Sequence, residues 1–328
     1  MAAIQDAKFK ELGLPKSISE VGKLNVYHRH LDKTSSTSPL LILIHGYPQS
    51  AYEWRLVIPL LPADVPIFCP DLPGYGLSAA LSEHTKLDHG IAILKAVRSS
   101  VPGTDVIPLV LVGHNRGTRI AHRLQVSSSA GEPQIKDLNL KFIGIALLDI
   151  LPTTLMWSLG ADAKTQVGSF HWAFLANVEL ATEMLKAYGG GKWAQQMIMR
   201  WAGSNERRLG KLKSGDALEV YGSFFDNESV LHASCKDYEA GAGLDVKAQV
   251  DDQESGRQID VPVLLLYGKE YLGAKPNVTV SNAWADWVKD QSLITEVGLG
   301  NGAGHFVAEE AAEETTDALL KWIEEIRG

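Results

Sequence analysis

Length, composition and charge limit the class of protein. The chain has 328 residues, 45% of them hydrophobic and 21% charged, so it is long enough for one large α/β domain with an inserted subdomain or for two smaller domains. Its 31 Lys and Arg against 39 Asp and Glu give a net charge of −8, which argues against nucleic-acid or anionic-membrane partners, because clustered basic residues bind both. A small anionic organic substrate remains compatible with this charge, since a few local arginines can override a weak overall field.

The cysteines and the amino terminus indicate where the protein resides. Cys69 and Cys235 are too few for a disulfide framework and favour a reducing compartment. Residues 1–16 are polar with scattered charges and lack the apolar core of a signal peptide. No apolar run reaches the roughly 18 residues that a membrane span needs. We therefore expect a soluble, cytoplasmic protein with no membrane partner.

Short apolar runs that stop at turns predict buried strands. In chain order these runs are 40–44, 67–69, 106–112, the run that ends at 148, 263–267 and 293–297. Helical spacing separates them near 52–61, 89–101 and 116–126. Apolar strands that alternate with helices are typical of a mostly parallel sheet covered on both faces. The sequence therefore predicts an α/β fold with active residues at the carboxyl ends of the strands.

The strand pattern disappears between residues 153 and 258, where Trp, Met, Lys and Gly recur with helical spacing. We predict a helical cap at 153–258, inserted into a core formed by 1–152 and 259–328. The three glycines at 189–191 are expected to form a flexible break in this cap, and 251–260 a polar return linker. Residues 309–326 predict a surface helix whose acidic first turn suits the helix dipole.

The segment Gly113-His114-Asn115-Arg116-Gly117 joins a predicted strand to a predicted helix, which is the pattern of a nucleophile elbow. The residue at its tip is Asn115, and a carboxamide is not a useful nucleophile. Asp149 ends the next strand and His305 lies in a late loop, which gives the order nucleophile, acid, histidine of the α/β-hydrolase arrangement. Glu270, after the strand at 263–267, is a second candidate for the acid.

Arg116 and Arg119 lie three residues apart in the first turn of the helix after the elbow, so they share one face. Two cations at the positive end of a helix repel each other and the dipole, a cost that makes sense if an anion binds there. The alternative is a pair of surface arginines bridged to nearby acids. His45 and His114 are expected to be structural.

Several segments together resemble the fluoroacetate (haloacetate) dehalogenase family of the capped α/β-hydrolases, from about residue 24 to the end of the chain. The segments are His45-Gly46-Tyr47-Pro48-Gln49, Asp71-Leu72-Pro73-Gly74-Tyr75-Gly76, Gly113-His114-Asn115-Arg116-Gly117-Thr118-Arg119, Leu148-Asp149-Ile150-Leu151-Pro152-Thr153, His171-Trp172, Cys235-Lys236-Asp237-Tyr238-Glu239-Ala240-Gly241 and Gly304-His305-Phe306. The cap motifs, His171-Trp172 and the segment from Cys235 to Tyr238, distinguish this family from the epoxide hydrolases, because the core motifs occur in both. The resemblance implies an α/β-hydrolase fold with a helical cap and a homodimer.

The resemblance also implies a two-step reaction on a 2-halocarboxylate. In the family an elbow aspartate displaces the halide and forms an ester, which water then hydrolyses. Here His305 would activate the water, with Asp149 orienting its imidazole. Arg116 and Arg119 would clamp the substrate carboxylate.

Two further sets of groups take their roles from the same resemblance. His171, Trp172 and Tyr238 would bind the departing halide through their N–H and O–H groups. The backbone N–H groups of Tyr47 and Arg116 would stabilise the oxyanion during ester hydrolysis. We expect no cofactor and no metal, because no His, Cys and Asp cluster has ligand spacing.

Asn115 departs from the family pattern and removes the charge that the first step requires, so we expect this chain to be inactive in that step. The exchange is either engineered to hold substrate, or natural in a non-catalytic carboxylate-binding pseudoenzyme. Alternatively, water activated by His305 attacks an ester or lactone directly. An epoxide hydrolase of the same fold is a further alternative and would need cap tyrosines, such as Tyr238 with Tyr188 or Tyr221.

Overall fold

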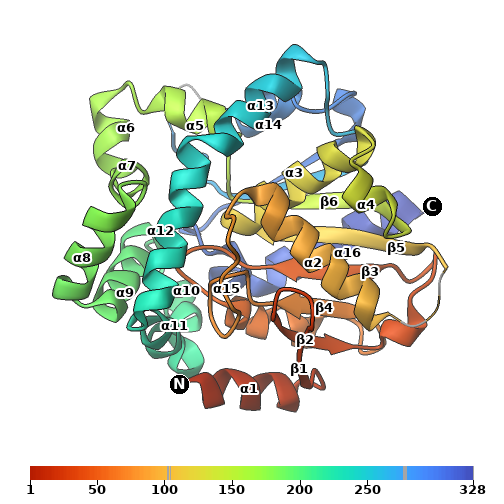
Figure 1. Cartoon of the computed structure of the whole chain (residues 1–328), viewed down its shortest axis with the longest axis horizontal. Coiled ribbons are helices and arrows are strands. Elements are labelled where there is room, and N and C mark those ends of the chain that lie inside the picture. Colours follow the sequence, from red (N-terminus) through yellow and green to blue (C-terminus); the bar gives the residue numbers. More distant parts are fainter. Residues whose placement is uncertain (102, 104, 276–278, 328) are drawn as a thin grey trace.

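An eight-stranded sheet forms the centre of the molecule (Figure 1). The computed structural model describes residues 1–101, 103, 105–275 and 279–327. The strand order across the sheet is β1-β2-β4-β3-β5-β6-β7-β8. The strands are β1 Lys16–Ile18, β2 Asn25–Arg29, β3 Leu40–Ile44, β4 Ile67–Pro70, β5 Ile107–His114, β6 Leu140–Leu148, β7 Val263–Gly268 and β8 Ile294–Leu299.

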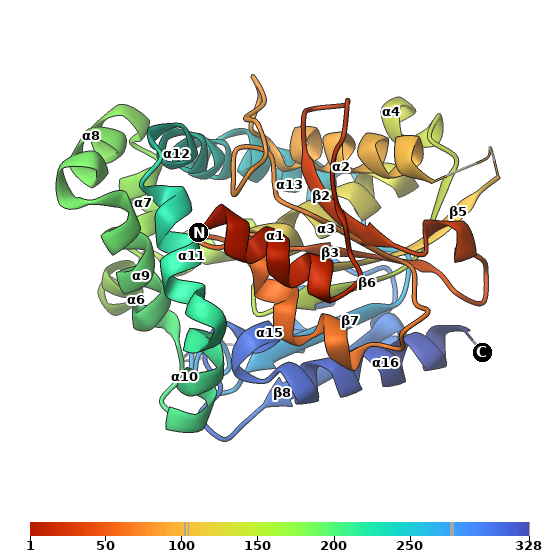
Figure 2. The same cartoon turned by 90° about the horizontal axis from the view of Figure 1, so that it is seen from below.

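Strand direction and helix placement follow the predicted α/β arrangement. β2 pairs antiparallel with β1 and β4, whereas every pair from β4 through β3 to β8 is parallel. Figure 2 shows helices above and below the sheet, with α2 and α3 on one face and α16 on the other. The α-helices outside the segment between β6 and β7 are α1 Ala2–Glu11, α2 Lys86–Ser100, α3 Arg116–Ser129, α4 Pro133–Lys136, α14 Val280–Ala285, α15 Val307–Glu310 and α16 Ala312–Arg327.

All six predicted strands are present, each within a few residues of its expected bounds. The sequence did not anticipate α1, β1 or β2, because short, partly polar edge elements carry little apolar periodicity. The predicted helix at 52–61 is wrong in type, since the chain forms two 3₁₀ helices, Ala51–Leu56 and Ile58–Leu60. Pro59 lacks the N–H that an α-helix would need at that position.

All the described secondary structure between β6 and β7 is helical. Most of these helices gather at one side of the sheet (Figure 1). We call α5–α13 the helical layer. Its members are α5 Thr153–Leu159, α6 Ala163–Gly168, α7 His171–Leu175, α8 Val178–Tyr188, α9 Gly190–Trp201, α10 Glu206–Lys213, α11 Ala217–Phe225, α12 Glu228–Ala242 and α13 Leu244–Glu254. The division into a core and an inserted cap at 152/153 and 258/259 stays a prediction.

Two details of the helical layer differ from the expectation. The glycines at 189–191 are a packed helix junction and not a flexible break, because a Cβ on Gly190 would lie 1.9 Å from the carbonyl oxygen of Phe225. Glycine is needed there so that α9 can start against the end of α11. The expected polar linker at 251–260 is helical as far as Glu254, where α13 ends.

The acidic run before the last helix is also placed differently from the prediction. Glu309 and Glu310 are fully buried in the short helix α15, and the chain breaks at Ala311 before α16 begins. Glu309 accepts hydrogen bonds from Arg55 and from the Tyr221 hydroxyl. These two carboxylates therefore serve internal contacts and are not helix-dipole charges on the surface.

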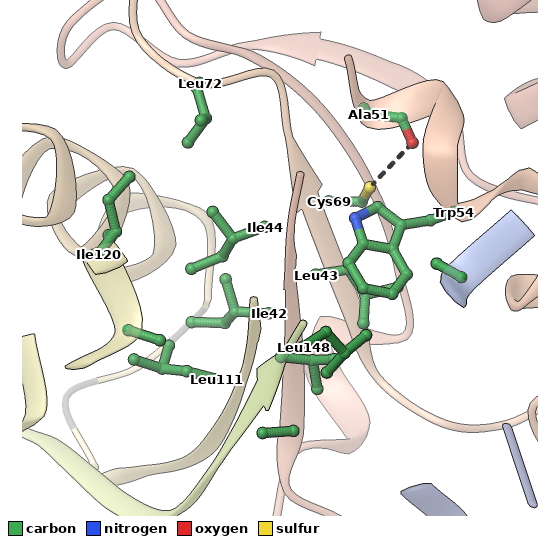
Figure 3. Close-up of a cluster of buried hydrophobic side chains, with 14 of the residues drawn as sticks. Ile42, Leu43, Ile44, Ala51, Trp54, Cys69, Leu72, Leu111, Ile120 and Leu148 are labelled. Carbon is green, nitrogen blue, oxygen red and sulfur yellow. Dashed lines mark hydrogen bonds between the residues drawn. The ribbon is translucent and has the colours of Figure 1, made fainter. Parts of the chain in front are cut away.

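The core packs against both faces of β3, β5 and their neighbours (Figure 3). All five side chains of β3 are buried, and they alternate between the faces of the sheet. Ile42 and Ile44 point toward Ile120 of α3, whereas Leu43 points toward Trp54. Burial of each such side chain contributes about 1.5–3 kcal/mol, so this cluster fixes the strand ends that carry the site.

Candidate active site

The turn between β5 and α3 has the geometry of a nucleophile elbow. Asn115 has φ 49° and ψ −109°, a conformation that non-glycine residues rarely adopt. The turn is tight because glycines flank it. A Cβ on Gly113 would lie 2.4 Å from the Gly117 carbonyl carbon, and one on Gly117 would lie 2.1 Å from the Ile44 carbonyl oxygen. The side chain of Asn115 consequently projects from the carboxyl edge of the sheet.

The carboxamide of Asn115 is held by three hydrogen bonds. Its Oδ1 accepts from the backbone N–H of Tyr47 at 3.1 Å and of Arg116 at 2.7 Å. Its Nδ2 lies 2.9 Å from His305 Nε2. An amide nitrogen can only donate, so His305 Nε2 is the acceptor and carries no proton. The two N–H groups that the resemblance assigns to the oxyanion therefore converge on one oxygen of the elbow side chain.

His305 and Asp149 form the other half of the site. His305 Nδ1 donates to Asp149 Oδ2 at 2.5 Å, and Asp149 Oδ1 accepts the backbone N–H of Gly268 at 2.9 Å. Glu270, the second candidate acid, instead accepts the backbone N–H of Gly302 at 2.8 Å. The structure thus brings Asp149, and not Glu270, to the histidine.

Burial controls the protonation of this pair. Removal from water raises the pKa of Asp149 to about 8, although the Gly268 hydrogen bond opposes the shift. Burial, followed by the positive field of His114, holds the pKa of His305 well below its usual range. A neutral His305 with a free Nε2 is the form that can accept a proton from water.

Sequence analysis assigned His114 a structural role, and its contacts show how it supports His305. His114 Nε2 lies 2.9 Å from the carbonyl oxygen of His305, and His114 Nδ1 lies 3.1 Å from Glu53 Oε2. Burial alone would lower the pKa of His114, but the Glu53 charge and hydrogen bond, with Asp149, raise it. His114 is thus held as a donor to the loop that carries His305.

Sequence analysis missed Glu310, which also fixes that loop. Its carboxylate accepts three backbone N–H groups, from Gly203 at 2.8 Å, Gly304 at 2.9 Å and Phe306 at 3.0 Å. Gly203 follows α9 in the helical layer, so one buried side chain ties this layer to the histidine loop. No sequence signal separates Glu310 from the neighbouring acids.

Arg116 is placed differently from the predicted carboxylate clamp. Its Nε donates to Asp237 Oδ2 at 2.6 Å, and its guanidinium stacks on the Tyr238 ring at 4.2 Å. Asp237 also binds Lys86, which pairs with Asp245. Burial would raise the pKa of Asp237, but Arg116 and Lys86 hold it well below the usual range. The bridged alternative considered for the arginines therefore applies to Arg116, in a buried form.

Arg119 lines the cavity and has no acid among its described hydrogen-bond partners. Its Nη1 donates to the Thr153 hydroxyl at 2.5 Å and to the Leu151 carbonyl oxygen at 3.4 Å, while its buried Nε has no partner. Its guanidinium lies 4.7 Å from the centre of the Trp172 ring. Burial and the charge of Arg116 lower the pKa of Arg119 to about 9. A desolvated, unpaired guanidinium favours an anionic ligand.

A cavity of about 480 Å³ opens beside the elbow. Both the elbow and the helical layer contribute to its wall. Its lining residues are Asn115, Arg119, Asp149, Ile150, Leu151, Met156, Lys164, Thr165, Gly168, Ser169, His171, Trp172, Arg200, Trp201, Tyr271, Leu272, Ala274, Lys275 and His305.

The predicted halide-binding residues are only partly in this lining. His171 and Trp172 line the cavity, and the buried Nδ1 of His171 has no hydrogen-bond partner within the described ranges. Tyr238 does not belong to the lining; its ring is buried against Arg116 and lies edge-on to Tyr47 at 5.1 Å. The helical layer therefore offers two of the three expected donors.

Two aromatic residues of the lining were not predicted. Trp201 packs against His171 with ring centres 4.5 Å apart, and its buried indole N–H has no hydrogen-bond partner in the described part of the chain. Tyr271 lies over His305 at 4.9 Å. Lone aromatic residues at helical spacing carry no functional signal in the sequence, because most serve packing.

The described residues contain no group of three or more His, Cys, Asp and Glu side chains that could hold a metal ion. Among them, no helix combines the length and the apolarity that crossing a bilayer requires.

The chain belongs to the alpha/beta hydrolase family, whose sequence model matches residues 41–318. The predicted α/β-hydrolase fold is therefore confirmed. Among curated proteins, the fluoroacetate dehalogenase of a Burkholderia species is 25% identical over 294 residues, or 89% of each chain. The soluble epoxide hydrolase of Corynebacterium sp. strain C12 is 25% identical over 93% of this chain and 96% of its own length. The haloalkane dehalogenase of Mesorhizobium japonicum is 24% identical over 90% and 87%.

Solved structures of other proteins share the fold. Cfl2 from Burkholderia cenocepacia superposes with a TM-score of 0.72 at 20% identity, covering 94% of this chain and 95% of its own. The epoxide hydrolase CorEH gives a TM-score of 0.73 at 19% identity, covering 95% and 99%. The relatives named here thus include dehalogenases and epoxide hydrolases, each 25% identical to this chain or less.

Proposed function

We propose that this chain is a hydrolase of the haloacetate dehalogenase type whose nucleophile is replaced by Asn115, and that its remaining site binds a small organic acid. The observation that carries the proposal is the placement of the Asn115 side chain. One side-chain atom is held by the N–H groups of Tyr47 and Arg116, and the other contacts His305. An aspartate is nearly isosteric and would fit the same position.

The reaction follows from that position with aspartate at residue 115. A free carboxylate oxygen attacks the carbon that bears the halogen, the carbon–halogen bond breaks, and halide leaves. The ester carbonyl oxygen then lies at the Tyr47 and Arg116 N–H groups, which stabilise the oxyanion when water attacks the carbonyl carbon. His305 accepts one proton of the water and returns it to the leaving alkoxide oxygen, so that a 2-hydroxy acid leaves. Residue 115 is then a carboxylic acid, and it loses the second proton of the water to solvent to regenerate its carboxylate.

The cavity wall supports an acid as the substrate. Arg119 is a buried cation without an acid partner in the described structure, and Trp172 covers its guanidinium. Arg116 is committed to Asp237, so the clamp relies on Arg119. The unpaired nitrogens of His171 and Trp201 are available as donors to a departing halide.

Direct hydrolysis of an ester or lactone receives less support. The two N–H groups that would stabilise an incoming carbonyl oxygen are already bound to Asn115 Oδ1. A substrate would first have to displace a side chain that His305 also holds. The epoxide alternative also receives less support, because none of its three proposed tyrosines is in the cavity lining. Tyr188 hydrogen-bonds to Gln196, Tyr221 hydrogen-bonds to Glu309, and Tyr238 packs against Arg116.

The test is an Asn115→Asp variant with fluoroacetate and chloroacetate. We expect this variant to release halide and the unchanged chain to release none, measured with ion-selective electrodes. Asn227→Asp makes the same chemical change at an exposed position and is the matched control. In an Asn115→Asp, His305→Gln double variant, mass spectrometry should detect an ester on residue 115.

Other outcomes would contradict the proposal in defined ways. If Asn115→Asp opens epoxides and releases no halide, the epoxide hydrolase alternative replaces it. If both forms bind haloacetates and acetate tightly by calorimetry and neither turns them over, the chain is a carboxylate-binding protein.

A further inference from the structure

The charge of the cavity lining is opposite to that of the chain. The whole sequence has a net charge of −8, yet the lining contains the cations Arg119, Lys164, Arg200 and Lys275 and a single carboxylate, Asp149. That carboxylate is already bound by His305 and by a backbone N–H. The lining therefore carries more positive charge than one substrate carboxylate can neutralise.

Arg200 and Lys275 stand apart from Arg119 in sequence and in the fold. Arg200 belongs to α9 in the helical layer, whereas Lys275 follows β7 in the sheet region. Their fields reach a common point, because both lower the pKa of His171 after burial and the charges of His305 and Arg116. The lining thus has cations on two of its walls in addition to Arg119.

Neither of these two cations has an ion-pair partner within the described ranges. Arg200 is exposed, and its contacts among the described residues include a hydrogen bond of 3.5 Å to the Val167 carbonyl oxygen and the Phe170 ring. Lys275 is half-buried, and burial lowers its pKa although Asp149 opposes the shift. Lys164 differs, because it has Asp162 nearby. Arg200 and Lys275 are therefore the cations that an anionic ligand would satisfy.

The cavity is also larger than a two-carbon acid requires. Its volume of about 480 Å³ falls in the range of sites that hold larger organic ligands. A ligand with one carboxylate at Arg119 would leave the positions of Arg200 and Lys275 to water.

We propose that the substrate is an organic dianion, with one acid group bound at Arg119 and a second acid group bound by Arg200 and Lys275. This inference rests on the proposed function for the first acid group. The second group sets substrate choice, because monoacids leave two cations uncompensated. Lys164 adds to the attraction at the α6 wall.

Calorimetry on the unchanged chain tests the inference, since Asn115 prevents turnover. The probes are three matched pairs of different length: succinate with butyrate, glutarate with pentanoate, and adipate with hexanoate, all at one ionic strength. We expect the best diacid to bind roughly tenfold more tightly than its monoacid partner. Equal affinities in all three pairs would overturn the proposal, and this comparison needs no variant.

Substitutions then locate the second group. Arg200→Gln and Lys275→Gln should each weaken the diacid roughly three- to fivefold and leave the monoacid unchanged. Lys192→Gln removes an exposed cation of the same helix that stacks on Tyr188, and should change neither affinity. A loss of monoacid and diacid affinity to the same extent would show an effect of net charge and contradict a second subsite.

Failure here is distinguishable from failure of the proposed function. Halide release by Asn115→Asp from monoacids only, with no diacid preference, leaves the proposed function and removes this inference. A diacid preference without halide release from any halogenated mono- or diacid supports this inference and contradicts the proposed function.

Discussion

Two parts of the cavity differ in whether their polar groups have hydrogen-bond partners. We call Asn115, His305 and Asp149 the corner, and Arg119, His171 and Trp201 the wall. At the corner, Asn115, His305 and Asp149 are joined by hydrogen bonds of 2.9 and 2.5 Å. On the wall, Arg119, His171 and Trp201 each carry a buried nitrogen without a hydrogen-bond partner among the described residues. The corner is organised before any ligand arrives, whereas the wall becomes complete only when an acceptor binds.

The largest expected effect comes from breaking the corner at Asp149. In the Asn115→Asp background, Asp149→Asn should slow ester hydrolysis on the order of 10⁴-fold, because His305 would lose the acceptor that fixes its tautomer. Single-turnover measurement of ester decay gives the rate. Glu270→Gln is the control, since that carboxylate contacts Gly302 instead. A comparable loss in Glu270→Gln would reverse the assignment of the acid.

The next effect concerns the buried support of the corner. Arg116→Gln should destabilise the fold by about 3–5 kcal/mol, because Asp237 would stay buried with Lys86 as its remaining cation. Urea unfolding followed by circular dichroism measures this free energy. Arg119→Gln, one helical turn away, should cost far less, since it leaves no buried acid unpaired. Equal losses would mean that the two arginines do not differ as described.

A smaller effect is expected on ligand affinity when a cation of the wall is removed. Arg119→Gln should weaken acetate or haloacetate binding to the unchanged chain roughly ten- to hundredfold, because it removes a charged donor from the ligand. Calorimetry gives the affinity. Thr153→Val removes the hydroxyl that Arg119 contacts and keeps the cation, so a much smaller loss is expected there. If Arg119→Gln binds as tightly as the parent, the acid lies elsewhere.

The pH dependence of ester hydrolysis tests the protonation of the corner without any further substitution. In the ester intermediate residue 115 is neutral, as Asn115 is, so the present protonation of the pair applies to that step. Burial raises the pKa of Asp149 to about 8, so below that pH Asp149 holds a proton and lacks the negative charge that would stabilise a protonated His305.

Ester decay in the Asn115→Asp variant should therefore rise about tenfold per pH unit and level off above about pH 8. Single-turnover rates measure it. The displacement of halide does not use His305 as a base, and serves as the internal control. A decay rate that is flat across this range would contradict the raised pKa.

The sequence predicted the elements of the fold whose patterns are local. Apolar runs located the parallel strands, and the elbow glycines located Asn115, because both signals come from backbone geometry over a few residues. The order of nucleophile, acid and histidine along the chain then predicted that Asp149 and His305 lie near the elbow. What the sequence could not show is which charges neutralise one another. The pairing of Arg116 with Asp237 spans 121 residues and depends on how α12 packs.

The same limit explains the other differences. Glu309 and Glu310 were predicted to be helix-dipole charges, because sequence spacing does not reveal burial. The glycines at 189–191 were predicted to form a flexible break, because the close approach of α11 has no signal in the neighbouring sequence. Trp201 and Tyr271 join the cavity only through the packing of the helical layer and the loop after β7.

Glu310 has a consequence for protein engineering. It holds Gly203, at the exit of α9, and Gly304, beside His305, with the same carboxylate oxygen. The helical layer and the loop that carries His305 are thus not independent modules. A helical layer grafted from a relative would preserve the position of His305 only if the donor segment carries an equivalent backbone N–H to residue 310.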